Sequence, residues 1–151
     1  MKANPTEIFT ILQLNQNDVS HFQKLISVLA HVFEEPTDIP DESYLEKLLA
    51  KPEFIALAVF NGTEIIGGLT GYELQKYYRR HSEFFLYDIA IDPAFQQRGL
   101  GTRLIVRLKE ICLQKGITEF FVDAHLSDTH ALKFYESFTQ RQDQVVQFSF
   151  S

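Results

Sequence analysis

The stretch that decides the fold is Tyr87-Asp88-Ile89-Ala90-Ile91-Asp92-Pro93, followed two residues later by Gln96-Gln97-Arg98-Gly99-Leu100-Gly101-Thr102. Its first part is an apolar run typical of a buried strand, and Asp92-Pro93 ends that run. Its second part is a polar loop with two glycines that opens a segment of helical periodicity, residues 99–115. Glycine lets a ligand approach the backbone, and the N–H groups at a helix start point toward an anion. The order of strand, glycine loop and helix therefore predicts a site that suits a pyrophosphate.

Two familiar nucleotide-binding signatures do not fit this loop. A dinucleotide-binding turn needs a third glycine where Leu104 stands, and a P-loop needs Gly-Lys-Ser/Thr after its spacer residues. Glycines in a strand-to-helix turn can also serve turn geometry alone. The ligand must therefore be inferred from what surrounds the loop.

The rest of the chain alternates short apolar runs with polar turns. Runs typical of strands cover residues 8–14, 53–60, 64–74, 83–91, 118–124 and 145–150. The second and third runs are joined by Asn61-Gly62, a dipeptide that tolerates the positive backbone angles of a tight turn. We therefore expect these two strands to pair antiparallel.

Helical periodicity appears between these runs. Helices are expected after the capping residues Asn17 or Asp18, from about Asp41 to Pro52, and over residues 99–115 and 128–138. The resulting order, β-α-α-β-β-β-α-β-α-β, differs from that of alternating doubly wound units. The sequence predicts a mixed α/β domain.

Length and composition are those of one globular domain, residues 1–151, with 45% hydrophobic and 23% charged residues. The longest apolar run, residues 54–60, is far shorter than the ~20 residues of a membrane span, and no secretory signal is evident. We therefore expect a cytoplasmic protein without a membrane partner. With 20 acidic and 14 basic residues, the formal charge of −6 disfavours nucleic acid and favours a cationic small molecule. The single cysteine, Cys112, excludes an internal disulfide.

Gln96, Gly99 and Gly101 reproduce the motif Gln/Arg-x-x-Gly-x-Gly/Ala, which follows a strand in the GNAT superfamily of N-acetyltransferases. The chain resembles this superfamily over nearly its whole length, because the order of elements is also similar. The resemblance implies a GNAT fold, which is a central mixed, mostly antiparallel sheet of six to seven strands flanked by about four helices. It also implies acetyl-CoA as cosubstrate and no metal.

The resemblance assigns the cosubstrate to two neighbouring segments. The loop and helix start would cradle the pyrophosphate, and the residues involved are Gln96, Gln97, Arg98, Gly99, Gly101 and Thr102. Backbone groups of the preceding strand would hold the pantetheine arm, at Ile89, Ala90 and Ile91.

A second GNAT element is an aromatic hydroxyl in a pattern like Ala-x-x-x-Tyr-Glu, which residues 131–136 fit. By resemblance, Tyr135 is the general acid that protonates the departing thiolate of coenzyme A. A phenol of ordinary pKa, about 10, can do so within hydrogen-bond reach of the sulfur. Ala131, Phe134, Tyr135 and Phe138 also have the spacing of an ordinary amphipathic stripe, which is the alternative interpretation.

Asp88 is a carboxylate within an otherwise apolar strand, where it is unfavourable unless it is paired, solvated or functional. An acceptor amine must lose a proton before it attacks, and a carboxylate can bind the ammonium form and take that proton, directly or through water. We therefore assign Asp88 as the second catalytic residue. The alternative is a solvent-facing side chain at a splayed strand end.

Residues 54–60, 66–72 and 87–91 resemble a narrower class, the type I aminoglycoside 3-N-acetyltransferases, which are antibiotic-resistance enzymes of the gentamicin and fortimicin group. This resemblance implies that the acceptor is an aminoglycoside or similar small polyamine, and it is compatible with a homodimer. The candidate acceptor-binding residues are Glu34, Glu35, Asp38, Tyr87, Asp123 and His125. The chain departs from the class at His125, where an acidic residue is expected, and at Thr139, where glycine is expected.

Two alternatives stay open at this point. The acceptor could be a protein lysine, an N-terminus or a metabolic amine, or the chain could be a sensor that binds acyl-CoA without turnover. A metal held by Asp123, His125, Asp128 and His130 is disfavoured, because their order matches no familiar ligand motif. Cys112 lies on an apolar helix face, so direct transfer in a ternary complex is preferred over an acetyl-cysteine intermediate.

Overall fold

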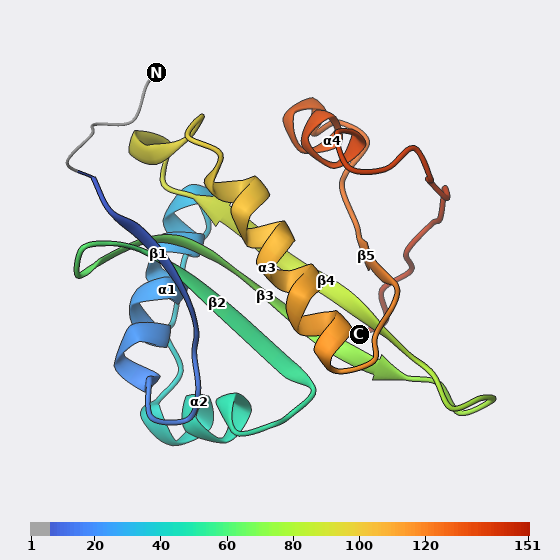
Figure 1. The fold of residues 1–151 in the computed structure, drawn as a ribbon, viewed down its shortest axis with the longest axis horizontal. Helices are drawn as coiled ribbons and strands as arrows, with labels where there is room; N and C mark the ends of the chain where they lie inside the picture. The colour runs from blue at the N-terminus through green and yellow to red at the C-terminus, as the bar shows by residue number, and fades with distance from the viewer. Residues whose placement is uncertain (1–6) are drawn as a thin grey trace.

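The computed structural model of the protein describes residues 7–151, and its elements follow the predicted chain order up to the last helix (Figure 1). The strands are β1 (Phe9–Gln13), β2 (Phe54–Asn61), β3 (Glu64–Gln75), β4 (Ser82–Ile91) and β5 (Phe120–Val122). The helices are α1 (Val19–Val32), α2 (Glu42–Leu49), α3 (Leu100–Gln114) and α4 (Thr129–Glu136), with a short 3-10 turn, η1 (Pro93–Phe95).

The strands form one sheet in the order β1-β2-β3-β4-β5. The first four strands pair antiparallel, whereas β4 and β5 run parallel. Gly62, in the turn between β2 and β3, has a φ of 62°, so the predicted antiparallel hairpin is confirmed. The mixed, mostly antiparallel sheet flanked by four helices also agrees with the predicted fold class.

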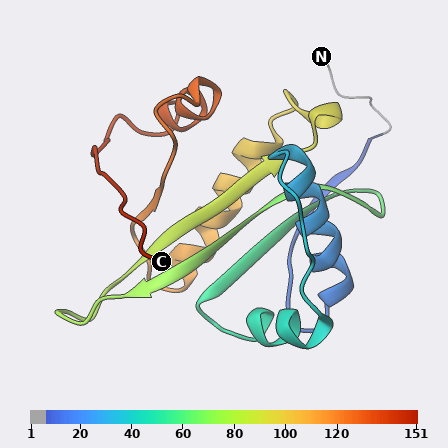
Figure 2. The same ribbon diagram turned by 180° about the vertical axis from the view of Figure 1, so that it is seen from behind.

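Helices cover both faces of the sheet. Side chains of β2 alternate between the two sides: Ile55, Leu57 and Val59 pack in a cluster with α3, and the intervening residues pack in another with α1 and α2. Figure 1 shows α3 in front of the sheet, and Figure 2, seen from behind, shows α1 on the opposite face. Because both faces of β2 are buried, its sequence is a continuous apolar run and does not alternate between apolar and polar residues.

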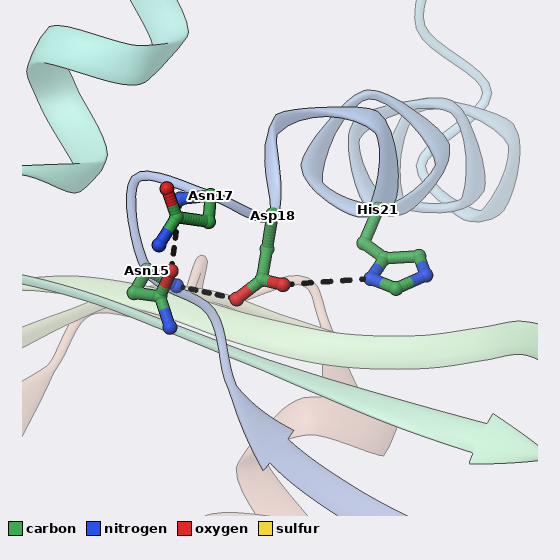
Figure 3. A network of polar contacts seen from close by, with 4 residues as sticks. All are labelled: Asn15, Asn17, Asp18 and His21. Atoms are coloured by element: carbon green, nitrogen blue, oxygen red, sulfur yellow. Dashed lines mark hydrogen bonds and ion pairs between the residues drawn. The ribbon is translucent and has the colours of Figure 1, made fainter.

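The connection from β1 to α1 is held by its own polar side chains (Figure 3). Asp18 is the N-cap of α1, but its carboxylate accepts a hydrogen bond from the backbone N–H of Asn15, at 2.9 Å, instead of capping the helix. The Asn15 side-chain oxygen accepts from the N–H of Asn17, at 2.8 Å. His21 Nδ1 lies 3.9 Å from the other carboxylate oxygen of Asp18. The predicted helix start is confirmed, but the Asp18 side chain stabilises the preceding turn and does not cap the helix.

The C-terminal part departs from the prediction. Within residues 7–151 the sheet has five strands, not six to seven, because residues 145–150 form no strand. Val145, Val146, Phe148 and Phe150 are 76–96% exposed, and no described residue after Ile117 is buried. An alternating apolar pattern becomes a strand only where a neighbouring strand completes the hydrogen bonding, and no described strand pairs with the outer edge of β5.

Candidate active site

The centre of the site is an irregularity in β4. Thr70 of β3 lies opposite Asp88, but the next residue, Gly71, lies opposite Leu86, so Tyr87 is the extra residue of a β-bulge. Beyond this point β4 also loses its other neighbour, because β5 pairs with β4 only over Phe84, Phe85 and Leu86. Within the described chain, the edge of β4 from residue 87 to 91 that faces away from β3 therefore pairs with no strand. Its backbone groups can bind an extended ligand.

The glycine loop follows directly at the end of this open edge. The Asp92 carboxylate accepts from the N–H of Ala94, at 2.9 Å, and the Gln96 side-chain amide donates to the carbonyl of Ile91, at 2.9 Å. Gln97 and Gly99 both have left-handed backbone angles, with φ of 61° and 75°. Gly99 is the N-cap of α3, whose first N–H groups have no acceptor within the helix. Such a turn before a helix start is a favourable anion site.

Helix α4 packs against the start of α3 and thereby positions Tyr135. The Asp128 carboxylate caps α4 by accepting from the N–H of Ala131, at 3.0 Å. The Phe134 ring lies against Gly101, and Phe134, Tyr135 and Phe138 all pack on the core cluster beneath α3. Tyr135 is half-buried. The glycine loop and the predicted acid are therefore held by one helix–helix contact.

Asp88 lies in an electrostatic environment that disfavours its charge. Burial raises the pKa of its carboxyl above the usual value, and the Glu35 carboxylate raises it further. Two carboxylates near one another favour a cationic ligand between them, because an ammonium group relieves the repulsion.

Tyr135 keeps its proton throughout the range in which enzymes work. Burial is the largest cause, and the carboxylates of Asp128 and Asp88 add to it, so the pKa of the phenol rises to about 12. The influence of Asp88 on this pKa places the two predicted catalytic groups in the same electrostatic neighbourhood. The arrangement has an anion site, an open strand edge, a carboxylate and a protonated phenol.

Comparison with known proteins identifies the family that has this arrangement. Residues 22–139 match the Acetyltransferase (GNAT) family. The chain belongs to this family.

Solved structures of aminoglycoside acetyltransferases are similar to this chain over 95% of its length. An aminoglycoside acetyltransferase, meta-AAC0020 from an uncultured soil metagenomic sample, solved with sisomicin, has a TM-score of 0.90 and 35% identity over 95% of both chains. Another, HMB0005 from a soil metagenomic sample, has a TM-score of 0.89 and 32% identity over 95% of this chain and 98% of its own.

Curated relatives give a shorter match. The ribosomal protein bS18-alanine N-acetyltransferase of Salmonella typhimurium strain LT2 is 36% identical over 55 residues, which are 36% of this chain and 37% of that protein. The match therefore spans much less than two thirds of the relative.

The structure gathers most of the GNAT residues predicted for the cosubstrate. Ile89, Ala90 and Ile91 lie on the open edge of β4. Gln96 has an organising role through its bond to the Ile91 carbonyl. Gln97, Gly99, Gly101 and Thr102 lie at the helix start, where Thr102 is exposed. The Arg98 guanidinium instead pairs with Glu7.

The predicted acceptor residues are less closely grouped. Glu35 acts on Asp88, and Tyr87 is exposed beside it on the bulge. The remaining four are exposed loop or strand-end residues for which the structure gives no contact with Asp88: Glu34, Asp38, Asp123 and His125. Their acceptor role stays a prediction.

Two tyrosines of this GNAT site were missed by the sequence reasoning. The Tyr72 ring lies edge-on to Tyr87, with centroids 5.9 Å apart. Burial raises the pKa of Tyr72, and the phenols of Tyr87 and Tyr44 and the carboxylate of Asp88 raise it further. Tyr44 lies in the predicted second helix and is 61% exposed. Its position between Ser43 and Leu45, outside the Leu45/Leu49 stripe, was the available signal.

Two other properties concern the described residues alone. Among residues 7–151, no group of three or more His, Cys, Asp and Glu side chains is arranged to hold a metal ion. No helix in this part of the GNAT chain is long and apolar enough to cross a membrane.

Proposed function

We propose that the protein transfers an acetyl group from acetyl-CoA to a primary amine of an aminoglycoside or similar small polyamine, by direct attack in a ternary complex. The observation that carries this proposal is the open edge of β4, which runs from the glycine loop to Asp88, a carboxylate whose charge also raises the pKa of Tyr135. The anion site at one end of this edge fits the phosphates of a long thioester. Asp88 at the other end, with Tyr135 on α4, fits the amine and the reacting thioester.

The residues present fit acetyl-CoA, which supplies an activated acetyl thioester. Left-handed Gln97 and Gly99 and the start of α3 would bind the pyrophosphate. Backbone groups on the open edge of residues 89–91 would align the pantetheine arm as an added strand, and one of the N–H groups would polarise the thioester carbonyl.

The acceptor would be bound and activated by carboxylates. An alkyl ammonium has an ordinary pKa near 10.4, so an amine arrives protonated. Asp88 and Glu35 together stabilise that cation, and Asp88 takes the proton, directly or through water, as the amine attacks. Tyr87 is next to Asp88 in the chain and its ring meets that of Tyr72, whose pKa the Asp88 carboxylate raises; these two phenols would supply donors and ring faces for the hydroxyls and ring carbons of an amino sugar.

Tyr135 would donate a hydrogen bond to the departing sulfur. Because its pKa is about 12 and that of an ordinary thiol is about 8.5, the phenol does not lose its proton completely to a free thiolate. Its contribution is therefore a hydrogen bond that strengthens as the carbon–sulfur bond breaks. Cys112 is 2% exposed and burial raises its pKa to about 11, which supports direct transfer over an acetyl-cysteine.

The solved neighbours support the acceptor class. Two aminoglycoside acetyltransferases are more than 30% identical to this chain over nearly its whole length, and one is in complex with sisomicin. We place the acetyl group on the 3-amino position, on the resemblance to the type I class. The curated similarity to ribosomal-protein-alanine acetyltransferases favours a second candidate, an N-terminal alanine, although it covers only 36% of the chain.

The test is thiol release from acetyl-CoA with gentamicin, fortimicin, kanamycin, spermidine, a lysine peptide and a peptide with N-terminal alanine in parallel. We expect release with the gentamicin-type compounds. Release with the alanine peptide alone would replace the proposed acceptor by the second candidate. Tight binding of acetyl-CoA without release for any acceptor would favour a sensor.

A further inference from the structure

The segment that enters β1 is attached to the glycine loop at three points, although the two are distant in sequence. The Glu7 carboxylate forms an ion pair with the Arg98 guanidinium. The Phe9 ring lies edge-on to Phe95, with centroids 6.2 Å apart and an interplanar angle of 84°. The Phe9 carbonyl accepts from the Arg103 guanidinium, at 3.2 Å. These contacts connect the first strand to both ends of the loop.

The ion pair is withdrawn from solvent. The Arg98 side chain is 8% exposed and that of Glu7 is 18% exposed. The Arg98 guanidinium also lies 5.2 Å from the Phe95 ring centroid, and it donates to the Ala94 carbonyl, at 3.4 Å. A charged side chain in such a place requires a partner, because an unpaired buried charge is strongly unfavourable.

Arg98 occupies the position where the loop backbone is most constrained. Its neighbours Gln97 and Gly99 have φ of 61° and 75°, and the first of these is a left-handed residue with a side chain. Such a conformation persists only where surrounding contacts impose it. The Arg98 side chain, held by Glu7 and Phe95, is such a contact.

We propose that Glu7 and Arg98 form a positioning pair that fixes the backbone N–H groups of residues 97–102 for the pyrophosphate of coenzyme A. This inference rests on the proposed function, because it takes the loop as the pyrophosphate site. Arg98 then acts through the backbone, and Glu7, which belongs to no recognised motif, becomes a determinant of cosubstrate affinity.

The two roles of Arg98 predict opposite effects of Glu7→Gln. If Arg98 contacts phosphate directly, removing the Glu7 charge frees the guanidinium and strengthens coenzyme A binding. If the pair positions the loop, the same change leaves Arg98 without its counterion, the loop rearranges, and the dissociation constant of coenzyme A rises on the order of tenfold. The double variant Glu7→Gln/Arg98→Met then binds coenzyme A no more weakly than the single variant with the larger loss of affinity, because either substitution already removes the same constraint on the loop.

The experiment measures coenzyme A binding by titration calorimetry, and KM and kcat with an accepted amine, for Glu7→Gln, Glu7→Asp, Arg98→Met, Arg98→Lys and the double variant Glu7→Gln/Arg98→Met. Arg107→Met and Glu110→Gln are matched controls, because that ion pair lies exposed on α3, the helix that the loop opens, at 3.0 Å. We expect KM for acetyl-CoA to rise in the Glu7 and Arg98 variants, with kcat and the acceptor KM unchanged and the controls normal.

Each remaining outcome contradicts a specific statement. Unchanged or tighter coenzyme A binding by a folded Glu7→Gln variant overturns the positioning pair while leaving the proposed function intact. A lower kcat together with equally raised KM values for acetyl-CoA and for the acceptor would indicate general destabilisation. That result would also overturn the positioning pair. If Glu7→Gln does not fold, Glu7→Asp, which keeps the charge but shortens the side chain, decides the question: weaker coenzyme A binding supports the positioning pair, and unchanged or tighter binding overturns it. Failure of the wild-type protein to bind coenzyme A overturns the proposed function and this inference together.

Discussion

Gly101 on α3 lies directly against the Phe134 ring on α4, so closely that a Cβ at Gly101 would be 3.1 Å from two carbons of that ring. Phe134 is adjacent to Tyr135, and the two rings meet edge-on with centroids 5.3 Å apart. The second glycine of the loop motif therefore has a role besides access to the backbone. It sets the distance between the helix that would bind pyrophosphate and the helix that carries the predicted acid.

Gly101→Ala is expected to change turnover more than stability. Alanine in a helix is more favourable than glycine by about 0.5–1 kcal/mol, which offsets the displacement of the half-exposed Phe134 ring. The displacement moves Tyr135, so kcat should fall about tenfold with little change in the melting temperature. Adding Phe134→Leu should restore part of kcat, and Phe134→Leu alone is the control. A lower melting temperature with normal kcat would show that the glycine serves packing only.

Tyr135→Phe is expected to lower kcat about 100-fold, while the affinity for coenzyme A stays within a factor of about two. The change removes only a hydroxyl from a ring that still packs on the core. Since the pKa of Tyr135 is about 12, loss of its proton cannot explain a decline in wild-type activity between pH 8 and 10. Single-turnover and binding measurements across pH check this, and a wild-type rate in the variant would remove the acid assignment.

Asp88→Asn is expected to abolish most activity and to stabilise the protein. The raised pKa of Asp88 means that the folded state binds this proton more tightly than the unfolded state, so the carboxylate reduces stability as pH rises through these pKa values. Asparagine should therefore raise the melting temperature at neutral pH, with the difference disappearing at acidic pH where Asp88 is protonated. Activity should fall at least about 100-fold. If Asp88→Asn lowers the melting temperature at pH 7, the claim that the charged Asp88 carboxylate destabilises the folded protein is contradicted.

Glu35→Gln tests the pairing of acidic groups at the acceptor site. Removing this charge relieves the repulsion that raises the pKa of Asp88, so the acidic limb of the kcat/KM profile should move to lower pH. The acceptor KM should rise about fivefold, because one of two carboxylates facing the ammonium is lost. Glu34→Gln is the neighbouring control. If the pH profile of kcat/KM does not move, Glu35 does not influence the titration of Asp88.

Local signals predicted the parts of the fold that depend on local chemistry. Asn61-Gly62 specifies its hairpin because few other residues accept its backbone angles, and Gly99 marks its helix start for the same reason. The segment 145–150 shows the limit of such signals. Its apolar alternation is that of a strand, but pairing depends on a partner edge that the pattern does not contain. Whether a second copy covers these exposed side chains, as a homodimer would, stays a prediction.

The sequence likewise predicted the parts of the site that lie in one stretch of chain, but not the contacts between distant segments. The loop and Asp88 stand out in one short stretch, but Glu7 and Arg98 are far apart in sequence, and nothing local shows that they pair. The bulge at Tyr87 arises from the register of two strands, and the proximity of Glu35 to Asp88 arises from packing of α1 on the sheet. These relationships depend on the assembled fold, so periodicity and motifs cannot reveal them.

The most direct measurement is mass spectrometry of gentamicin incubated with the protein and acetyl-CoA, with the product assigned by NMR and the Asp88→Asn and Tyr135→Phe variants in parallel. We expect one added acetyl group, on the 3-amino position, with strongly reduced product from both variants. An unmodified aminoglycoside in the presence of protein that binds acetyl-CoA, or product formed equally by the variants, would contradict the proposed acceptor or the assigned catalytic residues.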